Sequence, residues 1–436
     1  MCRCQPYLDG SGLNRYDTTY NTNLPTGYDL LPMDLNPLDT EQIGIKTLEK
    51  RLMKSDAAVS LKIGLPKEIS PDEMRLSLTP GGVSILRANN HEVYFEKGAG
   101  LDARFEDSEY TEAGAELVYS AEQLYKKSEF ILKVAPPDEK EIAIMNPGQI
   151  LLSALHLGNM TESRIRKLME KGISAIAYEF IRSEDHEFPI VRMMHEITGS
   201  LSVQIAAHHL ENGSEGQGVM LGGISGIPPA TVVILGAGII GEYAARTALG
   251  YGAQVFMLDN DLARLRRMEN ALDRRIITAT ANPQYLSSAL RFADVVIGAA
   301  MTEGERAPCL VTEAMVSGMK DRSVVVDTVI DQGGCIATSR PTTHSEPTFV
   351  RHGVIHYCVP NIPSNVARTA THALNNVLVP YLLAIGDSGG ISSCIWQNTA
   401  LRNGLYIYKN HLTKKLLSTQ FGIPYREIEA LITSRI

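Results

Sequence analysis

The sequence of 436 residues is poor in cysteine, in positive charge and in long apolar runs, and each shortage excludes a class of protein. Its six cysteines are few and scattered, which argues against a disulfide framework and favours free thiols in a reducing compartment. A net charge of -8 argues against nucleic acid as the main partner. No apolar run reaches the roughly 18 residues that a membrane-spanning helix requires, so we expect no membrane partner.

The beginning of the chain shows two further shortages. Met1-Cys-Arg-Cys-Gln-Pro6 lacks the apolar core of a signal peptide. Cys2 and Cys4 could form half of a metal site, but no second pair of ligands stands at a matching spacing, so we expect no metal. Together these observations predict a cytoplasmic protein. The 44% hydrophobic and 21% charged content is that of a globular protein, and the length predicts two domains, or as many as three.

A glycine-rich turn between apolar runs is the most informative stretch. Thr231-Val-Val-Ile-Leu235 is a β-branched run of the kind that forms a buried parallel strand. Gly236-Ala-Gly238-Ile-Ile-Gly241 follows, and then an Ala-rich helix candidate from Glu242 to Ala248 and a second apolar run that ends at Asp259. This order of strand, glycine turn, helix, strand and acid is the context in which G-x-G-x-x-G binds a dinucleotide.

Each glycine of this turn has its own physical role. Gly236 allows the tight turn, Gly238 lets the backbone approach a pyrophosphate, and Gly241 lets the helix pack closely on the strand. The helix N-terminus offers unpaired N–H groups to the phosphates. Asp259, at the end of the second apolar run, can accept both ribose hydroxyls and would repel a 2′-phosphate, so the motif predicts NAD rather than NADP. The alternative is a Rossmann-like turn that binds nothing, or another nucleotide.

Strand and helix candidates alternate on both sides of this motif. The alternation begins near Ser60 and resumes after Asp259. The segment from Arg368 to Ile385 is expected to be helical and to return to the first domain, where C-terminal helices join it. The pattern predicts an α/β fold with two Rossmann-like, doubly wound parallel-sheet domains and an interdomain cleft. We expect an N-terminal arm over residues 1–58, with one helix at Asp39–Met53. A substrate domain over 59–193 and 366–436 and an NAD-binding domain over 194–365 complete the expected division.

Four polar side chains stand where apolar strand candidates end, and ligands of an open parallel sheet bind at that edge. They are Arg75, Lys133, His156 and Asp331. Arg75 has a structural alternative as a solvated loop cation, and Lys133 as a snorkelling side chain. His156 could be a satisfied structural histidine, and Asp331 could only hold its turn. The first three belong to one expected domain and Asp331 to the other, so we expect them to face each other across the cleft.

Several stretches are familiar when they are taken together. These are Ile63-Gly-Leu-Pro-Lys-Glu68, Arg75-Leu-Ser-Leu-Thr-Pro-Gly-Gly82, His91-Glu-Val-Tyr-Phe-Glu-Lys-Gly-Ala-Gly100, Ile131-Leu-Lys-Val134, Leu155-His-Leu157 and Val232-Val-Ile-Leu-Gly-Ala-Gly238. The run from Ile330 to His344 follows, with Val354-Ile-His-Tyr-Cys-Val359 and Asn361-Ile-Pro363 after it. The chain thus resembles the alanine dehydrogenase and transhydrogenase α-subunit family over roughly residues 60 to 386. The last run resembles the alanine dehydrogenases in particular.

The resemblance implies an NAD-dependent oxidation of L-alanine to pyruvate and ammonium, reversible, in a homo-oligomer that is usually a hexamer in this family. It implies that Arg75 and Lys133 hold the substrate carboxylate and that Asn361 contacts substrate or nicotinamide. It assigns general acid and base catalysis to His156 and an assisting role in proton transfer to Asp331. The residues that it implies for cofactor binding are Gly236, Ala237, Gly238, Ile239, Ile240, Gly241, Asp259, Arg264, Asp331 and Ile362.

The chain departs from the family pattern at a few positions. Residues 1–58 have no recognised counterpart. Val359-Pro-Asn361 stands in place of Val-Ala-Asn, Ser364-Asn-Val-Ala-Arg368 lacks a proline before the arginine, and Ala281 replaces an expected serine near the adenosine. These departures concern cofactor affinity and subunit packing rather than the reaction.

Three other functions stay open on the sequence. The chain could be a transhydrogenase-like subunit that passes hydride between two nicotinamides, and formation of NADH from L-alanine and NAD alone would exclude this. It could oxidise a bulkier amino acid, as saccharopine-type enzymes do, which lysine plus 2-oxoglutarate would test. It could also be a catalytically silent protein that binds NADH without turnover.

Overall fold

The computed structural model describes residues 58–155, 160–301 and 306–433. The chain separates into two units, 1–54 and 55–436, and all described residues belong to the second. The expected arm with its helix at Asp39–Met53 therefore lies outside the described residues, and so does His156.

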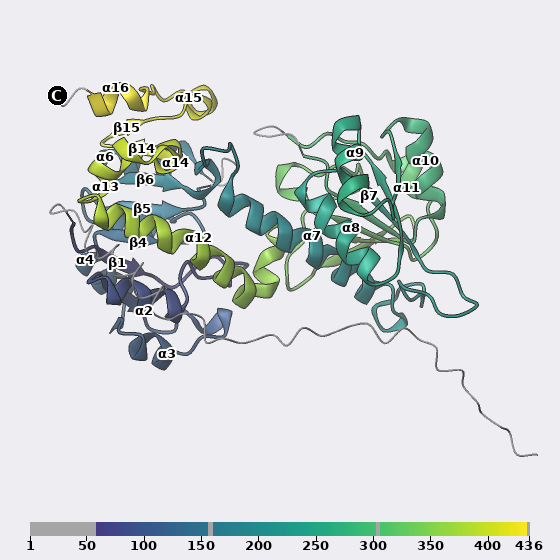
Figure 1. The fold of residues 1–436 in the computed structure, drawn as a ribbon, viewed down its shortest axis with the longest axis horizontal. Helices are drawn as coiled ribbons and strands as arrows, with labels where there is room; N and C mark the ends of the chain where they lie inside the picture. Colours follow the sequence, from purple (N-terminus) through teal and green to yellow (C-terminus); the bar gives the residue numbers. More distant parts are fainter. Residues whose placement is uncertain (1–57, 156–159, 302–305, 434–436) are drawn as a thin grey trace, which may run out of the picture. The chain divides into compact units, whose positions relative to one another are not determined.

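The first sheet has eight strands in the order β15-β14-β6-β5-β4-β1-β2-β3 (Figure 1). Its strands are β1 (Lys62–Leu65), β2 (Glu92–Glu96), β3 (Glu116–Val118), β4 (Phe130–Leu132), β5 (Ile150–Ser153), β6 (Ser174–Ala177), β14 (Leu405–Tyr408) and β15 (His411–Leu412). Strands β1 to β6 are parallel, because a helix returns the chain between consecutive strands. Those helices are α2 (Pro80–Ala88), α3 (Asp107–Glu112), α4 (Ala121–Lys127), α5 (Glu139–Ile144) and α6 (Glu162–Glu170).

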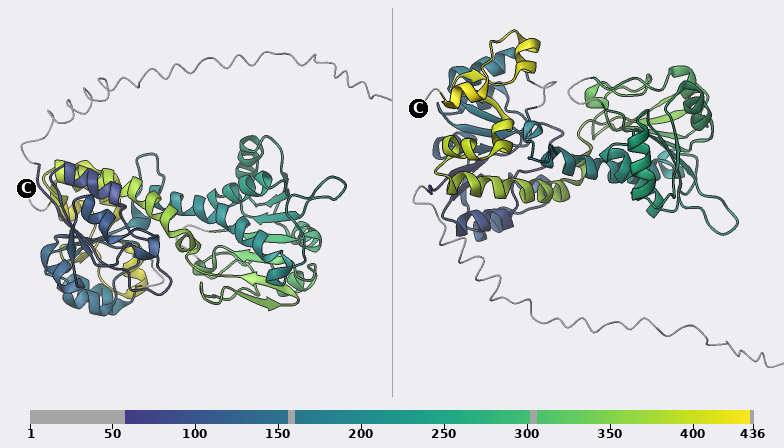
Figure 2. Two further views of the ribbon diagram at one scale, coloured as in Figure 1. Left: turned by 90° about the horizontal axis from the view of Figure 1, so that it is seen from below. Right: turned by 45° about the horizontal axis from the view of Figure 1, so that its top comes forward.

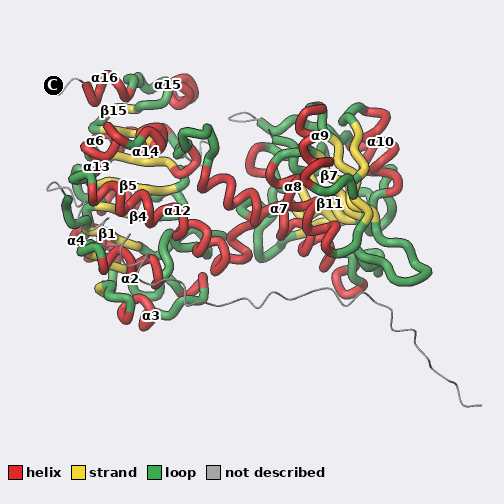
Figure 3. Tube along the Cα trace, in the orientation of Figure 1, coloured by secondary structure: helices red, strands yellow, loops and turns green. Residues whose placement is uncertain are grey.

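The second sheet has seven strands in the order β12-β13-β11-β10-β7-β8-β9. Its strands are β7 (Thr231–Leu235), β8 (Gln254–Leu258), β9 (Ile277–Ala279), β10 (Val295–Gly298), β11 (Val324–Asp327), β12 (Thr348–Arg351) and β13 (Val354–Tyr357). Among these described strands only β12 pairs antiparallel. The crossover helices are α8 (Ile239–Gly250), α9 (Leu262–Ala271), α10 (Pro283–Phe292) and α11 (Glu313–Ser317). Figure 3 shows the strands of each sheet flanked by helices.

Both sheets are buried on both faces, because alternate residues of a strand join different apolar clusters. In β7, Val232 and Ile234 belong to one cluster, and Val233 and Leu235 to another. Helices α2 and α12 (Ala367–Asp387) cover one face of the first sheet, and α4, α5 and α6 cover the other (Figure 2). A parallel strand with two buried faces requires a nearly continuous apolar run, and such runs identify the strands in the sequence.

Two 21-residue helices, α7 (Pro189–His209) and α12, contact each other. Helix α7 also packs directly on the backbone of α8, since a Cβ added at Gly199 would stand 2.3 Å from the carbonyl oxygen of Ile240. Helix α12 holds the loop after β1: Thr371 Oγ1 accepts from Leu76 N at 3.0 Å, and Asn375 Oδ1 accepts from Thr79 N at 3.1 Å. The loop that contains Arg75 is thus tied to a long helix.

The C-terminal region continues from α12 through α13 (Ile391–Gln397), α14 (Thr399–Gly404), α15 (Lys415–Phe421) and α16 (Ile428–Thr433). Within the described residues, no single helix combines the length and apolarity needed to cross a membrane. One sharply bent pair, Ile362–Asp387 with Ile391–Gln397, meets the criteria on length and composition alone.

The α/β fold with two doubly wound, mainly parallel sheets is confirmed. The helix expected at Arg368–Ile385 is confirmed within α12, and further helices follow it as expected. Strands β14 and β15, which lie between those helices, were not predicted, and they extend the first sheet. Strand β14 is a buried Leu-Tyr-Ile-Tyr run that directly follows α14 and pairs antiparallel with β6. Strand β12 is also antiparallel, since the short turn at His352-Gly353 leaves no room for a crossover helix.

Candidate functional site

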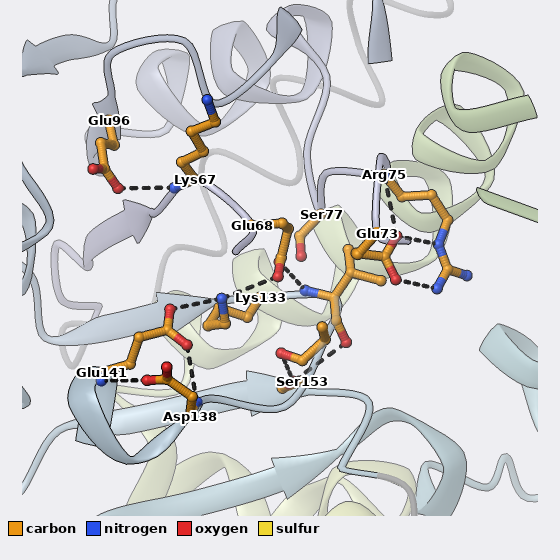
Figure 4. Close-up of polar contacts among 12 residues, drawn as sticks. Lys67, Glu68, Glu73, Arg75, Ser77, Glu96, Lys133, Asp138, Glu141 and Ser153 are labelled. Atoms are coloured by element: carbon orange, nitrogen blue, oxygen red, sulfur yellow. Dashed lines mark hydrogen bonds and ion pairs between the residues drawn. The ribbon is translucent and has the colours of Figure 1, made fainter. Parts of the chain in front are cut away.

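Lys133 directly follows β4 and is the most deeply buried cation of the described site, with 1% of its surface exposed. Its Nζ lies 3.0 Å from Glu68 Oε2 and 2.8 Å from Glu141 Oε1 (Figure 4). Burial opposes the charged form of Lys133, but the two carboxylates outweigh it and hold its pKa above the usual value. The snorkelling alternative is therefore wrong, since the ammonium does not reach water.

Arg75 follows β1, the strand beside β4 in the sheet, and is 8% exposed. Its Nε and Nη2 donate to the two oxygens of Glu73 at 2.7 and 2.6 Å, and its Nη1 lies 3.3 Å from the sulfur of Met194. Burial opposes the ionised form of Glu73, but Arg75 outweighs it and lowers the pKa of this carboxyl. Arg75 is not a solvated loop cation: it is half of a buried bidentate ion pair.

Asn361 follows β13 of the second sheet and contacts the same carboxylate. Its backbone is left-handed, with φ at 59°, and its Nδ2 donates to Glu73 Oε2 at 3.0 Å. Ser364, three residues later, accepts from Met74 N at 2.9 Å. The structure thus joins Arg75 and Asn361, two of the predicted substrate residues, through Glu73.

Asp331 lies in a 3-10 turn (Ile330–Gln332) after β11, and its side chain is exposed. The loop around it is shaped by Asp327, whose buried carboxylate accepts from Val329 N at 3.3 Å and Cys335 N at 3.1 Å. Burial raises the pKa of Asp327. Gly334 closes this loop with φ at 72°, and a Cβ there would stand 2.8 Å from Asp327 Oδ2. Strand β10 separates this loop's strand from β7 and its glycine turn.

The glycine turn has the geometry that its motif predicts at two of its glycines. Gly236 has φ at 110°, and a Cβ there would stand 2.6 Å from the carbonyl oxygen of Ala299. A Cβ at Gly241 would lie 2.0 Å from the carbonyl oxygen of Gly236. Gly238 differs, because its φ of -85° suits any residue and a Cβ there would meet no described atom within 4 Å. The described fold therefore does not itself require glycine at 238.

Helix α8 begins at Ile239 with Gly238 as its N-cap, and no side chain among the described residues caps it. Asp259, at the end of β8, accepts from Ala237 N at 2.7 Å and Asp261 N at 2.8 Å, so it is fixed beside the turn. Arg264 is exposed and lies 3.5 Å from Asp261. Ile240 and Ile362 are buried, so a cofactor would meet their backbone more readily than their side chains.

Neither of two hollows among the described residues contains the predicted site residues. One, of about 340 Å³, is lined by His208, His209 and His344 among others, and the second, of about 380 Å³, lies over the start of α2. In the described part of the chain no three His, Cys, Asp or Glu side chains are arranged to hold a metal ion.

The sequence prediction missed the carboxylates that hold its two cations. Glu68, Glu73 and Glu141 are all buried. Burial raises the pKa of Glu68 to about 7, although Lys133 lowers it. A signal for them existed: a lysine placed directly after a buried strand requires a counter-ion. The sequence alone did not say which of several nearby glutamates would supply it.

The sheets and the glycine turn define a doubly wound α/β protein with the turn of the dinucleotide-binding folds. Comparison with known families agrees. The model "Alanine dehydrogenase/PNT, N-terminal domain" matches residues 64–198, and "Alanine dehydrogenase/PNT, C-terminal domain" matches residues 202–415. The chain therefore belongs to the alanine dehydrogenase/PNT family, for which a pyridine nucleotide is the cofactor.

Individual relatives are similar over most of their length. The chain is 40% identical to an alanine dehydrogenase of Halomonas elongata over 377 residues, which are 85% of this chain and 100% of the relative. It is 42% identical to an alanine dehydrogenase of Bacillus subtilis over 364 residues, 83% of this chain and 95% of the relative.

Two solved structures share the fold. An L-alanine dehydrogenase superposes with a TM-score of 0.79 at 39% identity, covering 83% of this chain and 99% of that one. A transhydrogenase from Sinorhizobium meliloti has a TM-score of 0.69 at 24% identity, covering 81% and 99%, and shows the fold alone.

Proposed function

We propose that this chain is an NAD-dependent L-alanine dehydrogenase, which interconverts L-alanine with pyruvate, ammonium and NADH. The observation that carries the proposal is the pair of buried cations, Arg75 and Lys133, at the carboxyl ends of the neighbouring strands β1 and β4. Two cations in that place suit a small carboxylate substrate. The similarity to proteins named alanine dehydrogenase over most of the chain supports the same reaction.

The substrate carboxylate would be bound by Arg75 and Lys133. Arg75 presents a planar guanidinium whose Nη1 faces the sulfur of Met194, a weak acceptor that a carboxylate can replace, and Lys133 presents a point charge. Ion pairs with buried carboxylates already fix the positions of both cations, so substrate binding would require little reorganisation of either side chain. Asn361, tied to Glu73, would contact the substrate or the nicotinamide from the other sheet.

Proton transfer requires a base near the reacting carbon. We propose His156, which lies outside them, as the base that takes a proton from the water that attacks the imine carbon. The imine forms when the substrate Cα loses its hydride, and loss of ammonia then leaves pyruvate. Asp331 would stabilise the positive charge of the protonated imine from the loop after β11.

The described residues fit a dinucleotide. Gly238 is required neither by its backbone angles nor by neighbouring atoms, which is expected if a ligand approaches there. The uncapped first turn of α8 would bind the pyrophosphate through the N–H groups of Ile239, Ile240 and Gly241, with Ala237 beside them. Arg264, Asp331 and Ile362 would complete the contacts. The nicotinamide, when bound, supplies the acceptor for the substrate's hydride.

The preference for NAD over NADP rests on Asp259. Its carboxylate is fixed by two backbone N–H groups, and each oxygen keeps a lone pair for a ribose hydroxyl. A 2′-phosphate would meet this fixed negative charge, so NADP binding should be disfavoured.

The division into domains is also a proposal. Strands β14 and β15 of the C-terminal region complete the first sheet, which supports a substrate domain made of residues 59–193 and 366–436 around a nucleotide domain at 194–365. Cytoplasmic location and assembly as a homohexamer stay predictions, from composition and from the family resemblance.

The test is formation of NADH from NAD and L-alanine at alkaline pH, and its consumption with pyruvate and ammonium. We expect activity in both directions, no comparable rate with NADP, and none with lysine and 2-oxoglutarate. Activity that requires a second nicotinamide, or NADH binding without any turnover, would refute the proposal.

A further inference from the structure

Lys133 has two carboxylate partners where one would neutralise its charge. Its Nζ is 2.8 Å from Glu141 and 3.0 Å from Glu68, and all three side chains are buried (Figure 4). Above pH 7, where Glu68 is ionised as well, the cluster carries one net negative charge. Burying a second carboxylate destabilises the folded state, because each buried ion loses its hydration. Its presence here therefore indicates a functional role.

Both carboxylates are themselves fixed by other groups. Glu68 Oε1 accepts from Val134 N at 2.6 Å, which leaves Oε2 for the ammonium. Glu141 is the third residue of α5 and forms a capping box: its Oε2 accepts from Asp138 N at 3.0 Å, and Asp138 Oδ1 accepts from Glu141 N at 2.8 Å. Tyr125 donates to Glu141 Oε1 at 3.4 Å. Neither carboxylate can follow the ammonium if it moves.

An ammonium has three N–H donors, and the two fixed carboxylates take two of them. The direction of the third is then determined, and no further acceptor among the described residues takes it. A freely rotating ammonium loses rotational entropy when it binds a ligand. The ammonium of Lys133 has already lost this entropy on folding, so ligand binding does not cost it again.

We infer that Glu141, with Glu68, is a positioning residue that fixes Lys133 as a permanent cation with one N–H directed to the substrate carboxylate. The inference rests on the proposed function and deepens it. It assigns α5, which carries none of the predicted site residues, to the binding of substrate. Lys133 is then an anchor for a carboxylate and takes no part in proton transfer.

Other charged or titratable groups contribute to the field at this cluster. Glu73 acts on Glu68, and Glu68 acts on Tyr178. Arg75 acts on both Glu73 and Tyr178. Arg75 and Glu73 compensate each other as an ion pair, and burial keeps Tyr178 neutral. If Glu141 is neutralised, Lys133 keeps Glu68 as its partner, and the ion pair of Arg75 with Glu73 is unchanged. Glu141 is therefore the negative charge to remove in a test.

The test compares Glu141→Gln with Glu139→Gln. Glu139 lies on the same helix but is exposed and pairs with Lys167 at 2.9 Å, so it is a matched control. Glutamine can still accept from Asp138 N, as in the capping boxes that use it, so α5 should be retained. The probe is pyruvate, which has no group that titrates between pH 7 and 10.5, added to the enzyme with saturating NAD and followed by calorimetry.

We expect the Kd for pyruvate to stay within threefold between pH 7 and 10 in the wild type and in Glu139→Gln. In Glu141→Gln it should rise at least tenfold over that range, because Lys133 then loses its proton within it. At pH 7 the three proteins should agree within about threefold. Glu68→Gln, which changes a different element, should show the same alkaline rise if Glu141→Gln does not fold.

Two results would overturn the inference in distinguishable ways. If the wild type binds pyruvate, and Glu141→Gln and Glu68→Gln both show the same Kd as Glu139→Gln at every pH, the positioning role is wrong and the proposed function stands. If the wild type neither binds pyruvate nor forms NADH from L-alanine, the proposed function fails and the inference fails with it.

Discussion

The carboxyl ends of the strands carry different kinds of groups in the two sheets. The first places buried ionised side chains there: Lys133 with two carboxylates and Arg75 with one. The second places backbone there, with a glycine turn and the uncapped start of α8. A backbone site depends on the absence of side chains, and an ionic site depends on every member being present. Their responses to substitution should therefore differ in kind.

The largest effect should come from breaking the ionic site at its centre. Lys133→Met leaves Glu68 and Glu141 buried without a cation, which should cost about 3–5 kcal/mol in the free energy of unfolding. Lys167→Met removes the exposed pair with Glu139 and should cost about 0–1 kcal/mol. Urea denaturation measures both. Equal losses in the two variants would show that the buried cluster is no different from a surface ion pair.

The backbone site separates stability from binding. Gly241→Ala places a Cβ 2.0 Å from a carbonyl oxygen and should cost about 1–3 kcal/mol of stability. Gly238→Ala meets no described atom, so its stability should change by less than about 0.5 kcal/mol. Its Kd for NADH, from fluorescence titration, should nevertheless rise at least tenfold. Unchanged NADH binding in Gly238→Ala would place the dinucleotide elsewhere.

The pH dependence of stability should identify the ionic site. Burial raises the pKa of Glu68 from 4.5 to about 7, so the folded state binds this proton more tightly than the unfolded state. Its contribution is fully present below pH 4.5 and is lost as the pH rises through 7. Between pH 5 and 7 the wild type should lose stability more steeply than Glu68→Gln, by at most about 1.4 kcal/mol per pH unit. Parallel curves would contradict the raised pKa.

The smallest effect is expected at the edge of the backbone site. Arg264 is exposed and its ion pair with Asp261 is 3.5 Å long, so Arg264→Ala should change stability by less than about 1 kcal/mol. Its Kd for NADH should change by less than about threefold. A larger loss of NADH affinity would mean that the charge of Arg264 contributes directly to cofactor binding.

The same contrast explains what the sequence predicted. Most of the central strands and the glycine turn were predicted because their signals are local: an apolar run, or glycines at fixed spacing. The edge strands β3, β9, β12 and β15 were not predicted. Arg75 and Lys133 were selected because they follow strands. Their partners were missed, since Glu141 lies on a different element from Lys133 and only the folded chain shows that it returns to it. Strand β14 was missed for a related reason, because all strands of the second sheet lie between it and its partner β6 in the sequence.

The carboxylate of Glu73 accepts from Arg75 and also from Asn361, which follow strands of different sheets. A ligand that weakens the ion pair between Arg75 and Glu73 would change the hydrogen bond that Glu73 accepts from Asn361. A ligand that binds Asn361 would in turn change the ion pair of Glu73 with Arg75. By thermodynamic linkage the two effects are equal, so each ligand must alter the affinity for the other by the same factor. If Arg75 binds the substrate and Asn361 the nicotinamide, as proposed, Glu73 couples the two affinities by one common factor, which the Kd for pyruvate with and without NADH would measure.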